Sequence, residues 1–229
     1  MKPVKKFLLI KLPLTLILFS VLWVLLLKWI PVYNTPLMLK REIQYVKDDS
    51  FKTQKKWVSI DKIAPDVIKA VVASEDNRFF EHKGFDYEEI KKMLEEHNEK
   101  GKKLRGCSTI SQQTAKNVFT WSSDTWIRKA IEAYYAFLIE NIWGKKRIME
   151  VYLNVAEMGK GIYGVEAASN YYFNKHAYEL NRRQSVSLAV ILPSPLRWNP
   201  RNPTPYLEGR IKQISTRLYQ IEYPDWIHK

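Results

Sequence analysis

An almost uncharged apolar segment near the N-terminus constrains this chain more than any other feature. Residues 7–30 read FLLIKLPLTLILFSVLWVLLLKWI, and the 16 residues from 12 to 27 carry no charge. Lys11 and Lys28 flank this run, and their long side chains can extend to the polar interfaces of a bilayer. Three further lysines lie within the first six residues, which predicts a cytoplasmic N-terminus and an exported body. We therefore expect a single transmembrane helix.

Two other structures are compatible with an apolar N-terminal run. A cleaved signal peptide would require a short apolar core followed by a site with small residues, but residues 28–33 read KWIPVY. A buried core helix would not usually carry positive charge on one side only. The flanking residues favour an uncleaved membrane anchor over both alternatives.

The positive charge of the chain is concentrated at the same end. The net charge is +13, and seven bases precede the first acid, Glu42. The remaining residues hold 30 bases and 24 acids, a net charge of only +6. This distribution indicates a membrane surface and argues against nucleic acid as a partner. The single cysteine, Cys107, excludes an intramolecular disulfide framework and a cysteine-rich metal site.

The rest of the chain predicts a mainly helical domain. We expect residues 1–31 to form a cytoplasmic stub and anchor, residues 32–56 a polar juxtamembrane stalk, and residues 57–229 the folded domain. Helical periodicity and capping residues predict helices that begin at Pro65, Asp86 and Ser108, and further ones over 125–143, 148–155, 165–173, 183–192 and 206–221. The best strand candidate is Trp57–Ile60.

An acidic pair, Glu75 and Asp76, ends the first of these apolar helices and is followed by aromatic residues. A carboxylate buried beside Phe79 and Phe80 would have a raised pKa and could act as a base near neutral pH. The alternative is a solvated helix end with His82 as a capping residue, which is the more common situation for acidic residues.

Two further polar clusters are ambiguous when each is taken alone. Hydroxyl and amide residues over 106–117 lie at a helix start, where backbone N–H groups could bind an anion or where Ser108 could simply be an N-cap. Arg128 and Glu132 are one helical turn apart, which also fits a surface ion pair.

Taken in order, these clusters resemble the motifs of the family-51 glycosyltransferases, the peptidoglycan transglycosylases. Five blocks carry the resemblance between about Ser59 and Pro200. They are Glu75-Asp76-x-x-Phe79-x-x-His82-x-Gly84, Gly106-x-Ser108-Thr109-Ile110-x-Gln112-Gln113-x-x-Lys116-Asn117, Arg128-Lys129-x-x-Glu132, Tyr152-Leu153-Asn154 with Gly159, Gly164, Ala168 and Phe173, and Leu192-Pro193-x-Pro195 with Asn199-Pro200. The architecture is similar to that of the monofunctional biosynthetic enzymes, because the 29 residues after Pro200 are too few for a transpeptidase domain.

The resemblance implies a lysozyme-like helical fold and the polymerisation of lipid II by inverting glycosyl transfer, with release of undecaprenyl diphosphate. Glu75 would be the general base, and Glu132 would hold a divalent metal such as Mg²⁺ or Mn²⁺ or orient the basic groups. The resemblance implies substrate contacts for Asp76, Phe79, His82, Ser108, Thr109, Gln112, Gln113, Lys116, Asn117, Arg128, Lys129 and Asn154.

The same resemblance implies partners and a location. The partners are lipid II, the growing glycan, the bilayer, and divisome or penicillin-binding proteins. The location is the bacterial inner membrane, with a periplasmic catalytic domain that serves cell-wall biogenesis and cell shape.

This sequence departs from the family pattern at two positions. The second block usually begins Gly-Gly-Ser-Thr, and Cys107 replaces its second glycine. Many members carry an arginine shortly before the third block, where this chain has Asp124. If that alignment holds, Lys116 or Arg128 must balance more of the diphosphate charge.

Two other functions share parts of this pattern. A membrane-anchored lytic transglycosylase or muramidase would have a similar fold but would cleave glycan. A non-catalytic cell-wall scaffold would need only the anchor and the basic surface.

Overall fold

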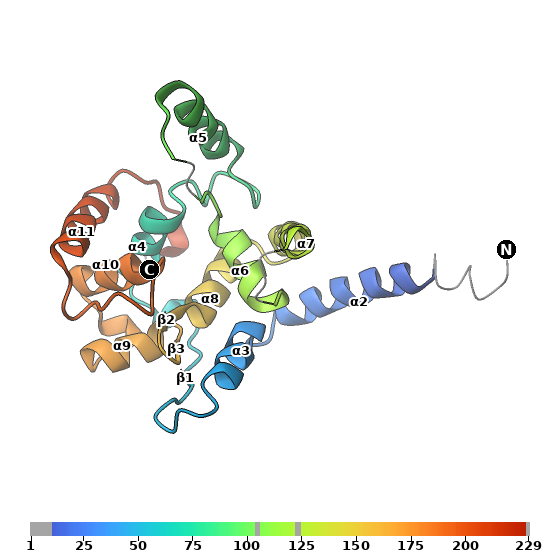
Figure 1. The fold of residues 1–229 in the computed structure, drawn as a ribbon, viewed down its shortest axis with the longest axis horizontal. Coiled ribbons are helices and arrows are strands. Elements are labelled where there is room, and N and C mark those ends of the chain that lie inside the picture. The colour runs from blue at the N-terminus through green and yellow to red at the C-terminus, as the bar shows by residue number, and fades with distance from the viewer. Residues whose placement is uncertain (1–10, 104–105, 122–124, 228–229) are drawn as a thin grey trace.

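The computed structural model describes residues 11–103, 106–121 and 125–227. Within them the chain is mainly helical, as predicted (Figure 1). The α-helices are α2 (Leu12–Leu27), α3 (Pro36–Gln44), α4 (Pro65–Glu75), α5 (Tyr87–Lys100), α6 (Ile110–Phe119), α7 (Trp126–Ile142), α8 (Lys145–Val155), α9 (Val165–Phe173), α10 (Arg182–Ile191) and α11 (Pro205–Arg217). The short 3₁₀ helices are η2 (Ile60–Lys62), η3 (Ala177–Glu179) and η4 (Asp225–Ile227).

Local sequence explains where the helices begin, but the predicted N-cap residue of α6 was wrong. Pro65 occupies the first position of α4, and Asp86 caps α5 by accepting from the backbone N–H of Glu89. The predicted cap of α6 was Ser108, but the cap is Thr109. Its hydroxyl accepts from the backbone N–H of Gln112, and the Gln112 side chain accepts from the N–H of Thr109. This reciprocal capping box satisfies two helix-end donors, so the helix begins one residue later than a serine cap would allow.

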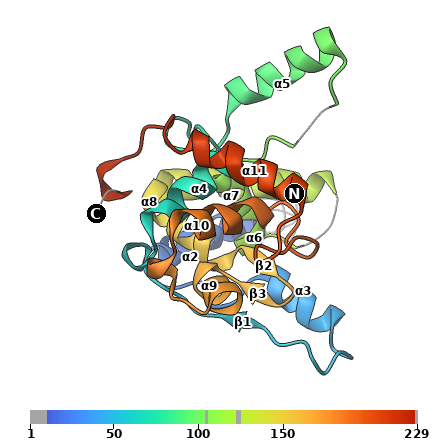
Figure 2. The same cartoon turned by 90° about the vertical axis from the view of Figure 1, so that its left-hand side faces the viewer.

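The core lies where the central helices cross. α4 packs against α10, and α6 packs against both α7 and α8. α8 and α10 are buried along most of their length, whereas α5 contains no buried residue and projects from the body (Figure 2). α4 therefore brings its C-terminal residue, Glu75, to the junction of the α10–α11 layer with α6.

A small three-stranded sheet has the order β1-β3-β2, with β1 (Gln54–Lys55) parallel to β3 (Ile162–Tyr163) and β2 (Glu157–Gly159) antiparallel to it. The strand predicted over Trp57–Ile60 is wrong. Asn154 explains the difference, because its side chain accepts from the backbone N–H of Val58 and donates to the carbonyl of Val58. These bonds replace the ladder bonds that a strand partner would provide.

The segment 32–56, expected to be a polar stalk, folds against the body. It contains α3 and β1, and Met38 of α3 is buried. The Arg41 guanidinium makes two hydrogen bonds to the Glu157 carboxylate, at 2.9 and 3.0 Å. Lys55 donates to the carbonyls of Val32 and Tyr33. A stalk rich in polar residues can therefore be a structural part of the domain.

The helix α2 extends away from the body (Figure 1). Its large apolar side chains are mostly exposed: Leu12, Leu14, Leu16, Ile17, Leu18, Phe19, Leu22, Trp23, Leu25 and Leu26. Its C-terminal half is attached to α7, where Trp143 Nε1 donates to the Val24 carbonyl at 2.7 Å and the hydroxyls of Ser20 and Tyr134 lie 2.7 Å apart.

No helix within the described residues is long and apolar enough to cross a membrane. The first four residues of the predicted span, 7–10, and the lysines that precede them lie outside the described residues.

Candidate active site

The predicted base, Glu75, lines a pocket of about 390 Å³. α4 ends at this residue, and another part of the pocket wall comes from α11. The segment before α6 contributes Ser108 and Thr109. The structure thus brings the first two sequence blocks together at one pocket, as the resemblance implies.

Burial raises the pKa of the Glu75 carboxyl above its ordinary value. Two hydrogen bonds and one positive charge oppose this effect. Gln113 Nε2 donates to Glu75 Oε2 at 3.0 Å, and the Ser74 hydroxyl lies 3.4 Å from Glu75 Oε1. The third opposing group is the guanidinium of Arg210. A carboxyl in this environment keeps a protein-held orientation and is a stronger base than a solvated glutamate.

The Gln113 side chain is itself held in one orientation. Tyr152 donates its hydroxyl to Gln113 Oε1 at 3.1 Å. Tyr152 is buried, and burial raises the pKa of its hydroxyl well above the ordinary value, so the tyrosine remains protonated and can donate. Because the amide oxygen is occupied, the amide nitrogen faces Glu75. The site role of Tyr152 was missed by the sequence analysis, although this residue belongs to the fourth block.

A second group of charges surrounds Glu132 on α7. Its carboxylate is almost fully buried and accepts from Arg128 Nη1 at 3.1 Å and from Lys129 Nζ at 2.6 Å. Both oxygens are therefore engaged by cations, and a metal ion bound to Glu132 would have to displace one of them. This geometry favours the alternative in which Glu132 orients the two basic groups.

Ser108 connects the two groups. It lines the Glu75 pocket, and its hydroxyl lies 3.5 Å from Lys129 Nζ. Lys116 belongs to α6, three residues after Gln113, and is exposed. The Glu75 pocket and one candidate diphosphate cation, Lys129, therefore adjoin one another at Ser108. Asp124, the position of the missing arginine, lies outside the described residues.

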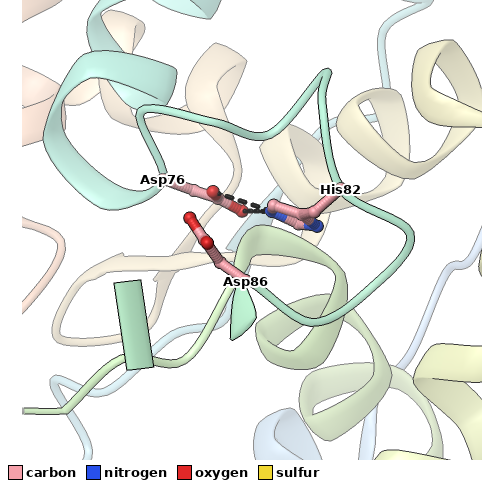
Figure 3. Close-up of side chains that lie close together, drawn as sticks. All are labelled: Asp76, His82 and Asp86. Atoms are coloured by element: carbon pink, nitrogen blue, oxygen red, sulfur yellow. Dashed lines mark hydrogen bonds and ion pairs between the residues drawn. The ribbon is translucent and has the colours of Figure 1, made fainter. Parts of the chain in front are cut away.

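Other predicted substrate residues have structural contacts. Asp76 accepts from His82 Nε2 at 2.9 and 3.1 Å (Figure 3). It also accepts from the backbone N–H of Ile110 at 3.0 Å, which ties the loop after α4 to the start of α6. Phe79 is fully buried and packs edge-on against Phe80 and His82. Contact of these residues with substrate stays a prediction.

On α6 and the neighbouring α8, predicted substrate residues also make contacts within the protein. Thr109 and Gln112 form the capping box, and the Thr109 hydroxyl also donates to the Gly84 carbonyl at 2.7 Å. Asn154 is buried and holds Val58. Asn117 is partly buried on α6. For these four residues a substrate contact also stays a prediction.

A metal ion was expected from the resemblance, and one group of three potential ligands occurs among the described residues. Asp76, His82 and Asp86 each offer a ligand atom within 4.8 Å of the others (Figure 3). These acids already accept from protein donors, and Arg78 Nη1 lies 3.2 Å from Asp86 Oδ1. An imidazole in the donor set is also unlike the all-oxygen shell that Mg²⁺ prefers. The cluster fits a polar link between loop and helix better than a Mg²⁺ site.

Sequence analysis also missed the contribution of α11. Arg210, Gln213 and Arg217 line the pocket from this helix. Their spacing of three and four residues places them on one face, but that spacing does not reveal which face meets the pocket.

The similarity to known proteins covers more of the chain than the five motif blocks do. A family described as Transglycosylase matches residues 41–219, a range that begins within α3 and contains all of α11. A protein of Bacteroides thetaiotaomicron named biosynthetic peptidoglycan transglycosylase is 53% identical over 196 residues, covering 85% of this chain and 79% of that protein. Proteins with the same name from Caulobacter vibrioides and Pseudomonas aeruginosa are 48% and 44% identical, over 90% and 91% of this chain and 88% and 90% of their own lengths.

Proposed function

Because the chain belongs to the transglycosylase family, we propose that it polymerises lipid II into the β-1,4-linked glycan strands of peptidoglycan and releases undecaprenyl diphosphate. One observation carries this proposal beyond the family match. A partly buried carboxylate, Glu75, lies in a pocket whose wall also contains Ser108, and the Ser108 hydroxyl lies 3.5 Å from Lys129, which pairs with Glu132. Such a pocket offers a base to the attacking hydroxyl of a glycosyl transfer and cations to its departing diphosphate.

Glu75 removes the proton from the 4-hydroxyl of the acceptor sugar. The hydroxyl oxygen then attacks the anomeric carbon of the donor, and the bond from that carbon to the diphosphate breaks with inversion. The hydrogen bond from Gln113 fixes the carboxylate, so the oxygen that accepts the proton is oriented before substrate arrives. The reaction resembles glycoside hydrolysis at an oxocarbenium-like centre, with a sugar hydroxyl in the place of water.

The departing diphosphate requires positive charge more than a proton. Lys129 and Arg128 are held by Glu132, and Lys116 is available at the surface of α6. Preorganised cations stabilise the developing charge of the leaving group without reorganising during the reaction. A divalent ion, when bound, supplies a further counter-charge to the diphosphate, and no step here depends on it.

The enzyme acts at the bacterial inner membrane, with the apolar segment 7–30 as its single anchor and the catalytic domain in the periplasm. The flanking lysines and the ten exposed large apolar side chains of α2 support this proposal. The lipid tail of the substrate lies in the same bilayer, so the anchor keeps the pocket near its substrate. Divisome or penicillin-binding proteins are the partners expected in that location.

Purified lipid II distinguishes this function from its rivals. The full chain in detergent or vesicles should produce glycan polymer that lysozyme digests, whereas the Glu75→Gln variant should not. A lytic enzyme would release fragments from sacculi and make no polymer, and a scaffold would do neither. Failure of the purified wild-type chain to polymerise lipid II would contradict the proposal.

A further inference from the structure

One face of α11 faces the catalytic pocket but belongs to none of the five motif blocks. Arg210, Gln213 and Arg217 all line the pocket that contains Glu75. The last block ends at Pro200, before α11 begins at Pro205. This face therefore adds polar contacts that the sequence motifs do not predict.

The two arginines on this face differ from the other arginine in the pocket wall. Arg78 pairs with Glu81, Asp86 and Glu88. In the part of the chain that the structure describes, neither Arg210 nor Arg217 has a hydrogen-bond or ion-pair partner, although Arg217 is partly buried. A partly buried guanidinium that faces a pocket without a protein acceptor is well suited to an anionic group of a ligand.

Arg210 and Arg217 are too far apart along α11 to bind the same ligand group. Seven helical residues correspond to about 10 Å, which is too far for both side chains to bind one carboxylate side by side. The charge of Arg210 acts on Glu75. Arg217 lies two helical turns further along, at the far end of the same face.

Arg217 also lines a second, larger pocket of about 850 Å³. Asn77, Arg78 and Arg217 line both pockets, so the two pockets lie next to each other along this edge. The outer pocket has an aromatic wall, where Phe80 packs edge-on against Tyr223. A ligand group bound at Arg217 can thus extend from the catalytic pocket into the outer pocket, the chamber beyond Arg217.

We propose that Arg217 and the outer pocket form a subsite for the peptide of the peptidoglycan substrate, in which Arg217 binds a free carboxylate of that peptide. The proposal rests on the proposed function, since it names a further part of the same substrate. A peptidoglycan precursor carries two kinds of anionic group, the diphosphate and the peptide carboxylates. The cations for the diphosphate come from α6 and α7, which lie on the other side of α4 from α11 (Figure 1). The peptide carboxylate is therefore the group that fits Arg217.

The test compares lipid II that has free peptide carboxylates with lipid II in which they are amidated. With the free substrate, Arg217→Gln should raise KM about tenfold, the scale of one charge-assisted hydrogen bond, and leave kcat within about twofold. With the amidated substrate, the wild type should already show the higher KM and the variant should add nothing. Lys212→Gln is the matched control, because Lys212 is an exposed cation of α11 that does not line either pocket.

Three results would overturn the subsite. An equal rise in KM with both substrates would assign Arg217 to the diphosphate, and unchanged KM with both would make it a solvated residue. The third result is a fall in both the thermal stability and the kcat of Arg217→Gln, with no selective restoration of KM for the free substrate by Arg217→Lys, which keeps the charge. That combination would indicate a structural role for Arg217.

Failure of the proposed function is recognised separately, because the wild type would then make no polymer from either substrate. In that case the binding of lipid-free muramyl peptide to the full chain tests the subsite directly. Tighter binding of the free than of the amidated peptide, lost in Arg217→Gln, supports it. Equal binding of the two forms contradicts it.

Discussion

Replacing Glu75 by glutamine removes the proposed base while preserving its contacts. The amide oxygen of the new side chain can accept from Gln113 Nε2, which now lies 3.0 Å from Glu75 Oε2. Its NH₂ group can donate to the Ser74 hydroxyl, which lies 3.4 Å from Oε1 and can rotate to accept. The variant should therefore fold, bind lipid II and retain the shape of the pocket.

Its polymerisation rate should fall by about 10²–10⁴, the usual scale for loss of a general base. That factor corresponds to about 3–5 kcal/mol of transition-state stabilisation. The measurement is single-turnover formation of glycan from radiolabelled lipid II, with binding of lipid II measured separately. A variant that polymerised lipid II at near the wild-type rate would refute the assignment of Glu75.

The pH dependence gives an independent check on the same residue. Because burial raises the pKa of Glu75, the wild-type rate should rise with pH through a value above the ~4.3 of an unperturbed glutamate. Below that raised pKa the carboxyl is protonated and cannot accept the proton of the acceptor. A rate limb centred at the ordinary glutamate pKa would contradict the buried base.

The same shift makes a prediction about stability. Between the ordinary and the raised pKa, the folded state binds more protons than the unfolded state, so the free energy of unfolding falls as pH rises. Above the raised pKa the cost of the buried charge is fully present. Since glutamine has no charge to bury, Glu75→Gln should be more stable than the wild type at pH 7, and the difference should disappear below the pKa of the unfolded chain. Denaturant unfolding at several pH values measures this, and a less stable variant at pH 7 would be inconsistent with it.

Four other perturbations test the remaining parts of the site and the anchor. Lys116→Ala should cost about 2–4 kcal/mol of transition-state stabilisation without changing Tm, because the side chain is exposed; a loss of turnover below threefold would make it a solvated residue. Asp76→Ala should lower the free energy of unfolding by about 2–4 kcal/mol in denaturant titrations, because two buried N–H donors lose their acceptor, and an unchanged midpoint would exclude this role. Glu132→Gln should reduce turnover about tenfold, because two cations lose the carboxylate that orients them; full activity of the variant would contradict that role. Removal of residues 1–30 should leave a folded domain that binds anionic vesicles in cosedimentation and is released by salt, whereas salt-resistant membrane residence would indicate another insertion site.

Several features of the site were predictable because they depend on residues close in sequence. Pro65 and Asp86 fix helix starts through local geometry, and the acid at the end of α4 belongs to a motif of fixed spacing. Ser108 and Thr109 show the limit of such rules, since either hydroxyl could cap α6 and only the reciprocal bond with Gln112 selects Thr109.

The roles of buried polar residues could not be assigned from spacing. Asn154 belongs to a motif block, but its amide holds the backbone of Val58, 96 residues away. Tyr152 orients Gln113 from another helix, and that contact depends on how α8 packs against α6. Contacts of this kind join segments far apart in the chain, so no local pattern carries them.

By itself, the sequence determined the helical character of the chain, most helix positions and the order of the family motifs, because capping and periodicity act over a few residues. Only the tertiary structure decided which faces meet. Packing of α11 beside α4 brings Arg210 and Arg217 to the Glu75 pocket, and the folding of residues 32–56 onto the body converts an expected stalk into part of the domain. The physical reason is that burial and charge pairing depend on neighbours in space, which a linear pattern of residues does not specify.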